Sequence, residues 1–240
     1  MINHHPPLND EPPPVNPDHP TVEPQLHIIE HEYSVEVIRK SVHLVSLSIP
    51  IVYYFVDKPM ALTLVIPLMT VFLVIDLARY YNQSVEHFVH KYFGFMMRKR
   101  EIDKKRKTLN GATYVLIAAT ICVLIFPKII TITSFSILII SDITSALVGR
   151  RFGKHRFIAK SLEGSSAFFF SAIIVVALTP KIEYHFAEYL IGVAAALVGT
   201  IAEALPADID DNLSIPLSVG ASLWLLYYLF LPALNVYKLG

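Results

Sequence analysis

Long apolar runs, separated by short charged segments, recur along most of this 240-residue chain. Several runs approach the roughly 20 residues that a helix needs to cross a bilayer. Hydrophobic residues make up 54% of the chain and charged residues only 17%, which favours an integral membrane protein. We predict an all-α fold, a polytopic membrane helix bundle of about seven spans, or six if the weak break at Pro127 does not separate two helices. The expected spans are 41–56, 60–78, 112–126, 129–148, 166–180, 186–205 and 213–235.

The basic residues predict the orientation of the bundle, because Lys and Arg accumulate on the cytoplasmic side of membrane proteins. With a cytoplasmic N-terminus, sixteen of the twenty Lys and Arg residues fall in cytoplasmic segments. The loops 98–110 and 150–165 and the acidic segment PADIDDN then lie on one face. We expect an integral protein of a prokaryotic plasma membrane, with its active site on the cytoplasmic face.

Residues 1–32 differ in composition from the rest of the chain. Eight of the sixteen prolines lie in the first 30 residues, together with scattered His and acidic residues and no apolar period. Such a segment buries too little apolar surface to order itself. We predict a disordered Pro/His-rich tail over 1–32, without a metal site, followed by an integral membrane catalytic domain over 33–240.

An amphipathic helix is expected between the second and third spans. Tyr81, Val85, Phe88, Tyr92 and Phe95 follow one another at steps of four and three residues, with polar residues on the opposite face. This spacing is typical of a helix that lies in the headgroup plane.

The basic cluster RKREIDKKRK, residues 98–107, contains seven bases and two acids. One interpretation is that it attracts anionic lipid headgroups and fixes the topology. The alternative is that some of its bases, Lys107 among them, reach the phosphates of a nucleotide. Outside the amphipathic helix, basic and aromatic residues are not interleaved in a way that predicts nucleic-acid binding.

Asp142 is an acid inside an apolar segment, and such a residue is expensive to keep and a functional candidate by default. It recurs with Ser145 and Gly149 at steps of three and four, so the three share one helix face. On the sixth span, Gly192, Ala196, Gly199 and Glu203 follow the small-xxx-small pattern that lets membrane helices approach closely.

If these two faces pack together, Asp142 and Glu203 meet, with Asp208, Asp210 and Asp211 just beyond. Clustered carboxylates repel each other unless a cation lies between them, and hard oxygen ligands favour Mg²⁺. The alternative is that each buried acid is paired with Arg or Lys.

The basic loop that follows Asp142 offers counter-charge for an anion. Its segment GRRFGKH resembles a phosphate loop only superficially, because three residues rather than four separate the glycines and neither Ser nor Thr follows Lys154. A Walker motif is therefore excluded. The lone Cys122 excludes an intrachain disulfide.

Several ordered blocks resemble the CTP-dependent lipid-alcohol kinases, which comprise dolichol kinase, phytol kinase and the CTP-dependent diacylglycerol kinase. The resemblance covers roughly residues 33–220. The blocks are EVIRKSVH (36–43), DLAR (76–79), MRKRE (97–101), NGATY (110–114), SDITSALVGRRFGKHRFIAKSLEG (141–164) and EALPADIDDNLSIPL (203–217).

The resemblance implies Mg²⁺-assisted transfer of the γ-phosphate of CTP to the hydroxyl of a membrane lipid such as phytol, a polyprenol or diacylglycerol. Such a transfer needs positioning and charge neutralisation more than covalent chemistry. Asp142, Asp210 and Asp211 are then expected around Mg²⁺, with Glu203 in support. His43 is expected to deprotonate the hydroxyl or bind a phosphate, and Asn212 to contact the base or ribose. The expected nucleotide-binding residues are Lys107, Arg150, Gly153, Lys154 and Lys160.

Two other functions remain open from the sequence. The 141–164 block is also similar to phosphatidate cytidylyltransferase, which releases pyrophosphate and makes an activated lipid, although the basic K-R and K-D signature near that enzyme's end is missing. A transporter, a channel or another non-enzymatic membrane protein would also explain acids inside apolar segments. Against a transporter, the charges gather at one face rather than near the midplane, and no repeated half with interrupted helices is found.

Overall fold

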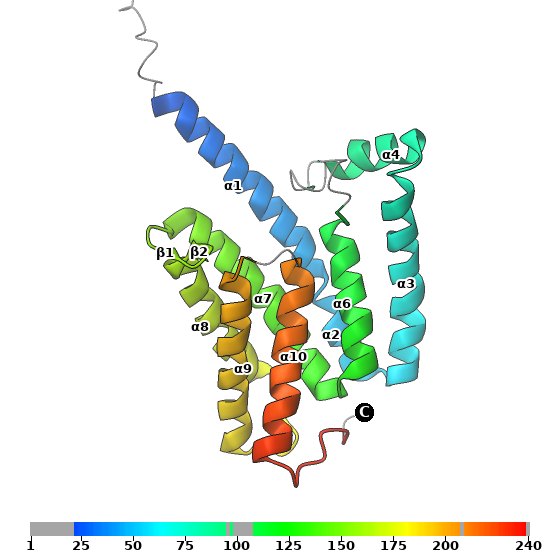
Figure 1. The fold of residues 1–240 in the computed structure, drawn as a ribbon, viewed down its shortest axis with the longest axis vertical. Helices are drawn as coiled ribbons and strands as arrows, with labels where there is room; N and C mark the ends of the chain where they lie inside the picture. Colours follow the sequence, from blue (N-terminus) through cyan, green and yellow to red (C-terminus); the bar gives the residue numbers. More distant parts are fainter. Residues whose placement is uncertain (1–21, 95–96, 98–107, 207–208, 239–240) are drawn as a thin grey trace, which may run out of the picture.

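The computed structural model describes residues 22–94, 97, 108–206 and 209–238, and these form helices joined by short connections and one small β-hairpin (Figure 1). The helices are α1 (Val22–Val45), α2 (Ser48–Phe55), α3 (Lys58–Ala78), α4 (Gln83–Phe93), α6 (Gly111–Ile125), α7 (Lys128–Phe152), α8 (Leu162–Leu178), α9 (Phe186–Ala204) and α10 (Asp211–Phe230).

Four helices are long and apolar enough to cross a membrane, namely α3, α7, α9 and α10. Helices α6 and α8 are apolar but shorter, with 15 and 17 residues. The break at Pro127 does separate two helices, because α6 ends at Ile125 and α7 begins at Lys128. The all-helical bundle is confirmed in the described residues, whereas seven spans are not.

The first expected span, 41–56, is not one continuous helix. Helix α1 ends at Val45, and the chain turns through Ser46 and Leu47 before α2 begins at Ser48. Proline is favoured in a first helical turn and tends to kink or break a helix interior, and Pro50 lies in the first turn of α2. Helix α1 also begins at Val22, within the segment that the sequence assigns to the tail, and residues 1–21 lie outside the described part of the chain.

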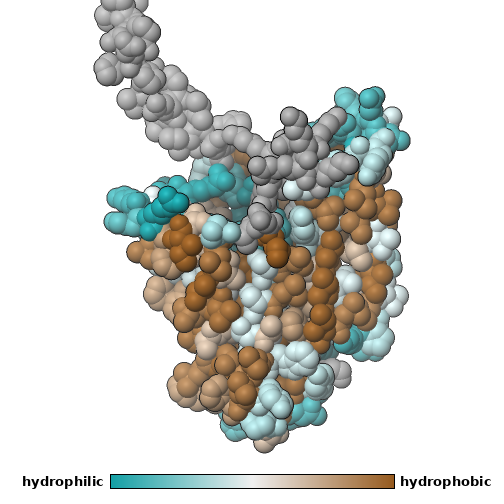
Figure 2. Space-filling model, viewed as in Figure 1, coloured by the Kyte–Doolittle hydropathy of each residue, from teal (hydrophilic) through white to brown (hydrophobic). Residues whose placement is uncertain are grey.

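Helix α7 lies at the centre of the bundle and packs against α8, α10, α1 and α2. In its most apolar 18-residue window 72% of the residues are buried, against 11% in the outermost helix, α3. Its large side chains, such as Phe135 and Leu138, share one apolar core with Phe168 of α8 and Ile215 of α10. The face of the bundle shown in Figure 2 is broadly apolar along its middle, and hydrophilic residues gather at its ends.

The small-residue face of α9 permits close packing, as predicted, but its partners are α8 and α10 rather than α7. A Cβ atom added at Gly192 would lie 2.3 Å from Val176 Cγ1 on α8, and one added at Gly199 would lie 2.6 Å from Val219 Cγ2 on α10. Helix α8 packs beside α7 instead, and glycines also face each other there: an added Cβ at Gly164 would lie 3.2 Å from Gly149 Cα.

We expect Gly192→Ala to lower the thermal stability of the purified protein. Val176 is β-branched and stiff at χ1, so it cannot move away freely from the added methyl group. Overpacking of this kind costs about 1–3 kcal/mol of unfolding free energy. The matched control is Gly94→Ala, where the nearest atom, His90 Nδ1, lies 3.9 Å from the added Cβ. Thermal midpoints measured in one detergent check the prediction, and an equal or larger loss in the control would contradict it.

Helix α4 is the amphipathic helix expected from the sequence, and it lies across the end of α3 (Figure 1). Asn82 caps its N-terminus by accepting hydrogen bonds from the backbone N–H groups of Ser84 and Val85. Phe88 and Tyr92 are exposed, with ring centroids 4.9 Å apart, whereas Val89 is buried. Contact of these exposed rings with lipid headgroups stays a prediction, and Phe95 lies outside the described residues.

Candidate functional site

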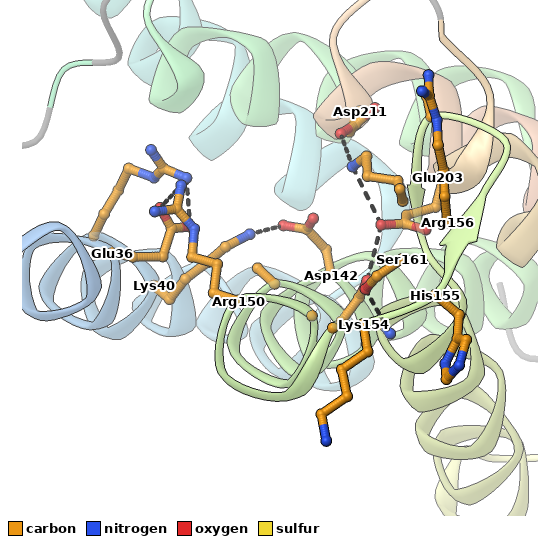
Figure 3. A pocket seen from close by; sticks show the side chains of 18 of the residues that line it. Glu36, Lys40, Asp142, Arg150, Lys154, His155, Arg156, Ser161, Glu203 and Asp211 are labelled. Carbon is orange, nitrogen blue, oxygen red and sulfur yellow. Dashed lines mark hydrogen bonds and ion pairs between the residues drawn. The ribbon is translucent and has the colours of Figure 1, made fainter. Parts of the chain in front are cut away.

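A cavity of about 1110 Å³ opens at one end of the bundle. It lies between the second half of α1, the carboxyl end of α7, the β-hairpin, and the adjoining ends of α9 and α10. Six basic and four acidic residues line it, and Figure 3 shows most of their side chains. The bases are Arg39, Lys40, Arg150, Lys154, Arg156 and Lys160, and the acids are Glu36, Asp142, Glu203 and Asp211.

Gly153 caps the carboxyl end of α7 and lines this cavity. An added Cβ there would lie 2.3 Å from Gly149 O and 2.8 Å from Ser161 Oγ, so a side chain cannot be accommodated. The chain then forms two short antiparallel strands, β1 (Arg156–Phe157) and β2 (Lys160–Ser161). Ile158 in the connecting turn has a φ of 53°, which is strained for a β-branched residue. The small hairpin was not expected in the all-α prediction.

The hairpin is fastened to the helices on both sides. Ala159 N donates to Ala204 O at the end of α9, with a separation of 3.1 Å. Glu163, at the start of α8, accepts hydrogen bonds from the backbone N–H groups of Lys154 and His155 and pairs with the His155 ring at 2.8 Å. The hydrogen bond to His155, helped by these backbone donors, lowers the pKa of Glu163 to about 2. The loop that carries Lys154 and Lys160 is therefore held in place by its own acid.

Three groups of ion pairs cross the cavity, with Asp142 in the middle (Figure 3). Lys40 Nζ on α1 donates to Asp142 Oδ2 on α7, and both residues are buried. On one side, Glu36 accepts from Arg39 and from Arg150, whose Nη2 lies 2.9 Å from Glu36 Oε2. Each buried carboxylate has a basic partner, as expected if the ionised forms are kept.

Lys160 forms the third group. Its Nζ lies 3.2 Å from Glu203 Oε1 and 3.1 Å from Asp211 Oδ2, so it bridges α9 and α10. Burial by itself lowers the pKa of Lys160, but the carboxylates of Asp211 and Glu203 outweigh burial and leave the pKa above its ordinary value. The ammonium is therefore fully charged at neutral pH and stands where an anion entering the cavity would meet it.

Glu203 is almost completely buried at the base of the cavity. Besides Lys160, it accepts hydrogen bonds from Ser145 Oγ on α7 at 2.8 Å and from Ser165 Oγ on α8 at 3.3 Å. The hydrogen bond from Ser145 is a side-chain contact between α7 and α9, where direct helix packing was expected, and the one from Ser165 joins α8 to α9. The carboxylate is thus held by three different elements, which orient it toward the cavity.

The larger cavity brings together most of the residues expected from the sequence, and the remaining ones lie elsewhere. Asp210 is buried as the N-cap of α10, and its Oδ1 accepts from the backbone N–H and the side-chain amide of Asn212. His43 and Asn212 line a second, adjoining cavity. Lys107 lies outside the described residues. The predicted residues in the larger cavity are Asp142, Arg150, Gly153, Lys154, Lys160, Glu203 and Asp211.

The fit to Mg²⁺ can be judged from the donors. Within the described residues, no three His, Cys, Asp or Glu side chains are grouped so as to hold a metal ion. Asp142 and Asp211 both face the cavity and offer hard oxygen ligands, the type that Mg²⁺ prefers. Their present partners are Lys40 and Lys160, whereas Asp210 faces its own helix end. The metal site stays a prediction, resting on Asp142 and Asp211 rather than on Asp210.

The sequence analysis assigned no role in the candidate site to Glu36 or Lys40. In the structure Lys40 pairs with Asp142, and Glu36 pairs with Arg150. Their membership of the EVIRKSVH block was the available signal. Ser145 was placed on the correct face, but its hydrogen bond to Glu203 was not expected.

Asp76 and Arg79 of the DLAR block fix the start of α6 beside the cavity. Asp76 Oδ1 pairs with Arg79 Nε at 2.8 Å, and Asp76 Oδ2 accepts from Asn110 N. Arg79 also donates to Thr108 O at 2.8 Å and contacts the sulfur of Met97, which lines the cavity. The block therefore has a positioning role: it joins the end of α3 to the segments on either side of 98–107.

The fold and the charged cavity define a helical membrane protein with a polar site at one end of its bundle. An uncharacterized protein of Rickettsia prowazekii (strain Madrid E) is 31% identical over 182 residues, which are 75% of this chain and 89% of the relative. The chain belongs to the same family as this Rickettsia protein. Neither a family model nor a solved structure matches the chain.

Proposed function

We propose that this protein is a Mg²⁺- and CTP-dependent kinase that phosphorylates the hydroxyl of a membrane lipid alcohol on the cytoplasmic face. The observation that carries the proposal is the cavity of about 1110 Å³, lined by six bases and four acids, at the end of an apolar bundle. Its volume suits a ligand at least as large as a nucleotide, since pockets for small molecules span about 300–1,000 Å³. The choice of CTP and of a kinase reaction comes from the ordered sequence blocks.

The lining of the cavity supports this proposal, because phosphoryl transfer depends on positioning and charge neutralisation. Lys160 and Arg150, with Lys154 at the rim, supply positive charge for a triphosphate. Mg²⁺, when bound by Asp142 and Asp211, would neutralise negative charge on the phosphates. Because Lys40 and Lys160 already partner these acids, nucleotide binding is expected to replace part of the internal ion pairing.

In the proposed reaction the oxygen of the lipid hydroxyl forms a bond to the γ-phosphorus of CTP. The bond between that phosphorus and the bridging oxygen breaks, and its electron pair leaves with CDP. The hydroxyl proton passes to the ring of His43, whose Nε2 lies 3.9 Å from Asp142 Oδ2, and then to water. The products are CDP, a lipid monophosphate and one proton.

The test is to incubate purified protein and Mg²⁺ with CTP or ATP, together with phytol, a polyprenol, diacylglycerol or phosphatidate. Mass spectrometry then identifies both products. A phosphorylated alcohol with CDP is the expected result. A CDP-lipid with pyrophosphate would replace the kinase by a cytidylyltransferase, and absence of turnover with every pair would contradict both enzymatic functions.

Arg150 and Arg151 provide a matched comparison at the end of α7. Arg150 lines the cavity, whereas Arg151 does not and lies beside the Phe152 ring. We expect Arg150→Ala to raise KM for the nucleotide about tenfold to hundredfold, since a hydrogen bond to a charged group contributes about 1.5–3 kcal/mol. Glu36 keeps Arg39 as a partner, so the fold is retained. KM for the nucleotide is measured by steady-state kinetics. An equal increase in KM for Arg150→Ala and Arg151→Ala would refute a nucleotide-binding role of Arg150.

A further inference from the structure

A second cavity of about 100 Å³ adjoins the larger one and shares with it Arg39, Lys40 and Asp142. It lies farther along α1, between α1, α7 and the amino ends of α6 and α10. The Lys40–Asp142 ion pair thus belongs to the walls of both cavities. A group bound in the small cavity would touch the same carboxylate that faces the proposed nucleotide site.

The lining of the small cavity suits a hydroxyl group. His43, Ser46, Asn110 and Asn212 contribute polar side chains, and Asn212 is buried. Apart from the shared ion pair, Arg39 and His43, the remaining lining residues carry no ionisable side chain. Such a lining can donate to and accept from one small neutral polar group, whereas it offers little to a triphosphate.

The rim of the small cavity is apolar and faces outward. Val42 of α1 is 45% exposed, and Ala112 of α6 is exposed as well. Ile38 and Val45 extend the exposed apolar stripe of α1 at steps of four and three residues. Helix α1 packs mainly against α7, so this stripe is left uncovered by the described residues. A hydrocarbon chain that lies along α1 would bring its end to the rim.

From this arrangement, and resting on the proposed function, we propose that the small cavity binds the hydroxyl end of the acceptor and restricts it to primary alcohols on a single hydrocarbon chain. A volume of about 100 Å³ corresponds to roughly three water-sized groups, since one water takes about 30 Å³. A hydroxyl and its first two carbons fill this space. In diacylglycerol, the carbon next to the hydroxymethyl group already bears an ester and a second chain, which do not fit.

The subsite can be tested by photolabelling, which does not depend on turnover. Full-length protein in lipid nanodiscs is irradiated with a hexadecanol that carries a diazirine near its hydroxyl, and labelled peptides are identified by mass spectrometry. We expect label around Val42 to Ser46 and around Ala112, competed by unlabelled geranylgeraniol but not by dioleoylglycerol. Label spread over the outward face of α3, or equal competition by dioleoylglycerol, would overturn the proposal.

A matched pair of variants sharpens the test. Ala112→Leu narrows the rim and should reduce specific labelling about tenfold, whereas Ala221→Leu adds the same side chain at an exposed position of α10, away from both cavities, and should not. Equal labelling of both variants would also overturn the proposal. Specific labelling without phosphorylation of any alcohol would reject the kinase while leaving the alcohol subsite in place, so the two failures are distinguishable.

Discussion

Replacing Asp142 by Asn is expected to lower kcat by about 10³-fold, the cost of removing one preorganised electrostatic group from a site of this kind. Asparagine keeps the size of the side chain but loses the charge that faces both cavities. It is a poorer ligand for Mg²⁺ and a weaker partner for Lys40. Product formation measured at saturating CTP and alcohol checks this expectation.

Loss of the carboxylate also leaves Lys40 buried without its ion-pair partner, which itself destabilises proteins. The double variant Lys40→Met with Asp142→Asn removes both charges and separates the two effects, because its stability should recover while its activity stays low. Asp57→Asn at the opposite end of the bundle is the control, since asparagine caps α3 as well as aspartate does. Full activity in Asp142→Asn would remove Asp142 from the proposed metal site.

Lys160→Met is expected to reduce kcat/KM for the nucleotide by about 10²- to 10³-fold. Methionine has nearly the same length, but it leaves Glu203 and Asp211 without the ammonium that bridges them and deprives a triphosphate of its best-placed cation. Because the neighbouring carboxylates raise the pKa of Lys160, the wild-type ammonium keeps its proton as the pH rises through the neutral range. The ratio of kcat/KM between the variant and the wild type should therefore stay the same from about pH 6 to about pH 9.

The control for Lys160→Met is Lys58→Met, in which the lysine lies at the other end of the bundle and donates to Leu124 O. Lys160→Arg should restore part of the nucleotide affinity, because it restores the charge with different geometry. A deficit in Lys160→Met that appears only on the basic side of the pH profile would contradict a permanently charged phosphate-binding group.

The longer helices could be predicted from hydropathy alone. The runs 60–78 and 186–205 correspond to α3 (Lys58–Ala78) and α9 (Phe186–Ala204), because a predominantly apolar run of about 20 residues is stable in lipid as a helix. The division of 41–56 was not predicted, since neither Gly nor a charge marks the turn at Ser46 and Leu47. Pro50 was the one local signal, and it is compatible with the first turn of α2.

From the sequence, only the end of the bundle at which the site residues lie could be predicted, because this follows from the chain topology. Alternating helix directions are enough to place Asp142, Lys160 and Glu203 at the same end of the bundle. The pairing of Lys40 with Asp142 joins residues 102 positions apart in the chain, and it depends on how α1 crosses α7. A single sequence contains no local pattern for such a contact, so the partners of the buried acids became visible only in the folded chain.

The large cavity lies at the end of an apolar bundle, where a water-soluble reactant and a hydrophobic reactant can both be reached (Figures 1 and 2). Two substances that do not mix ordinarily meet only after one of them has been extracted into an unfavourable medium. In this protein the large charged cavity and the small cavity with its apolar rim share the side chains of Arg39, Lys40 and Asp142. In the proposed reaction, the nucleotide would stay in water and the lipid in the bilayer while their reacting atoms come into contact.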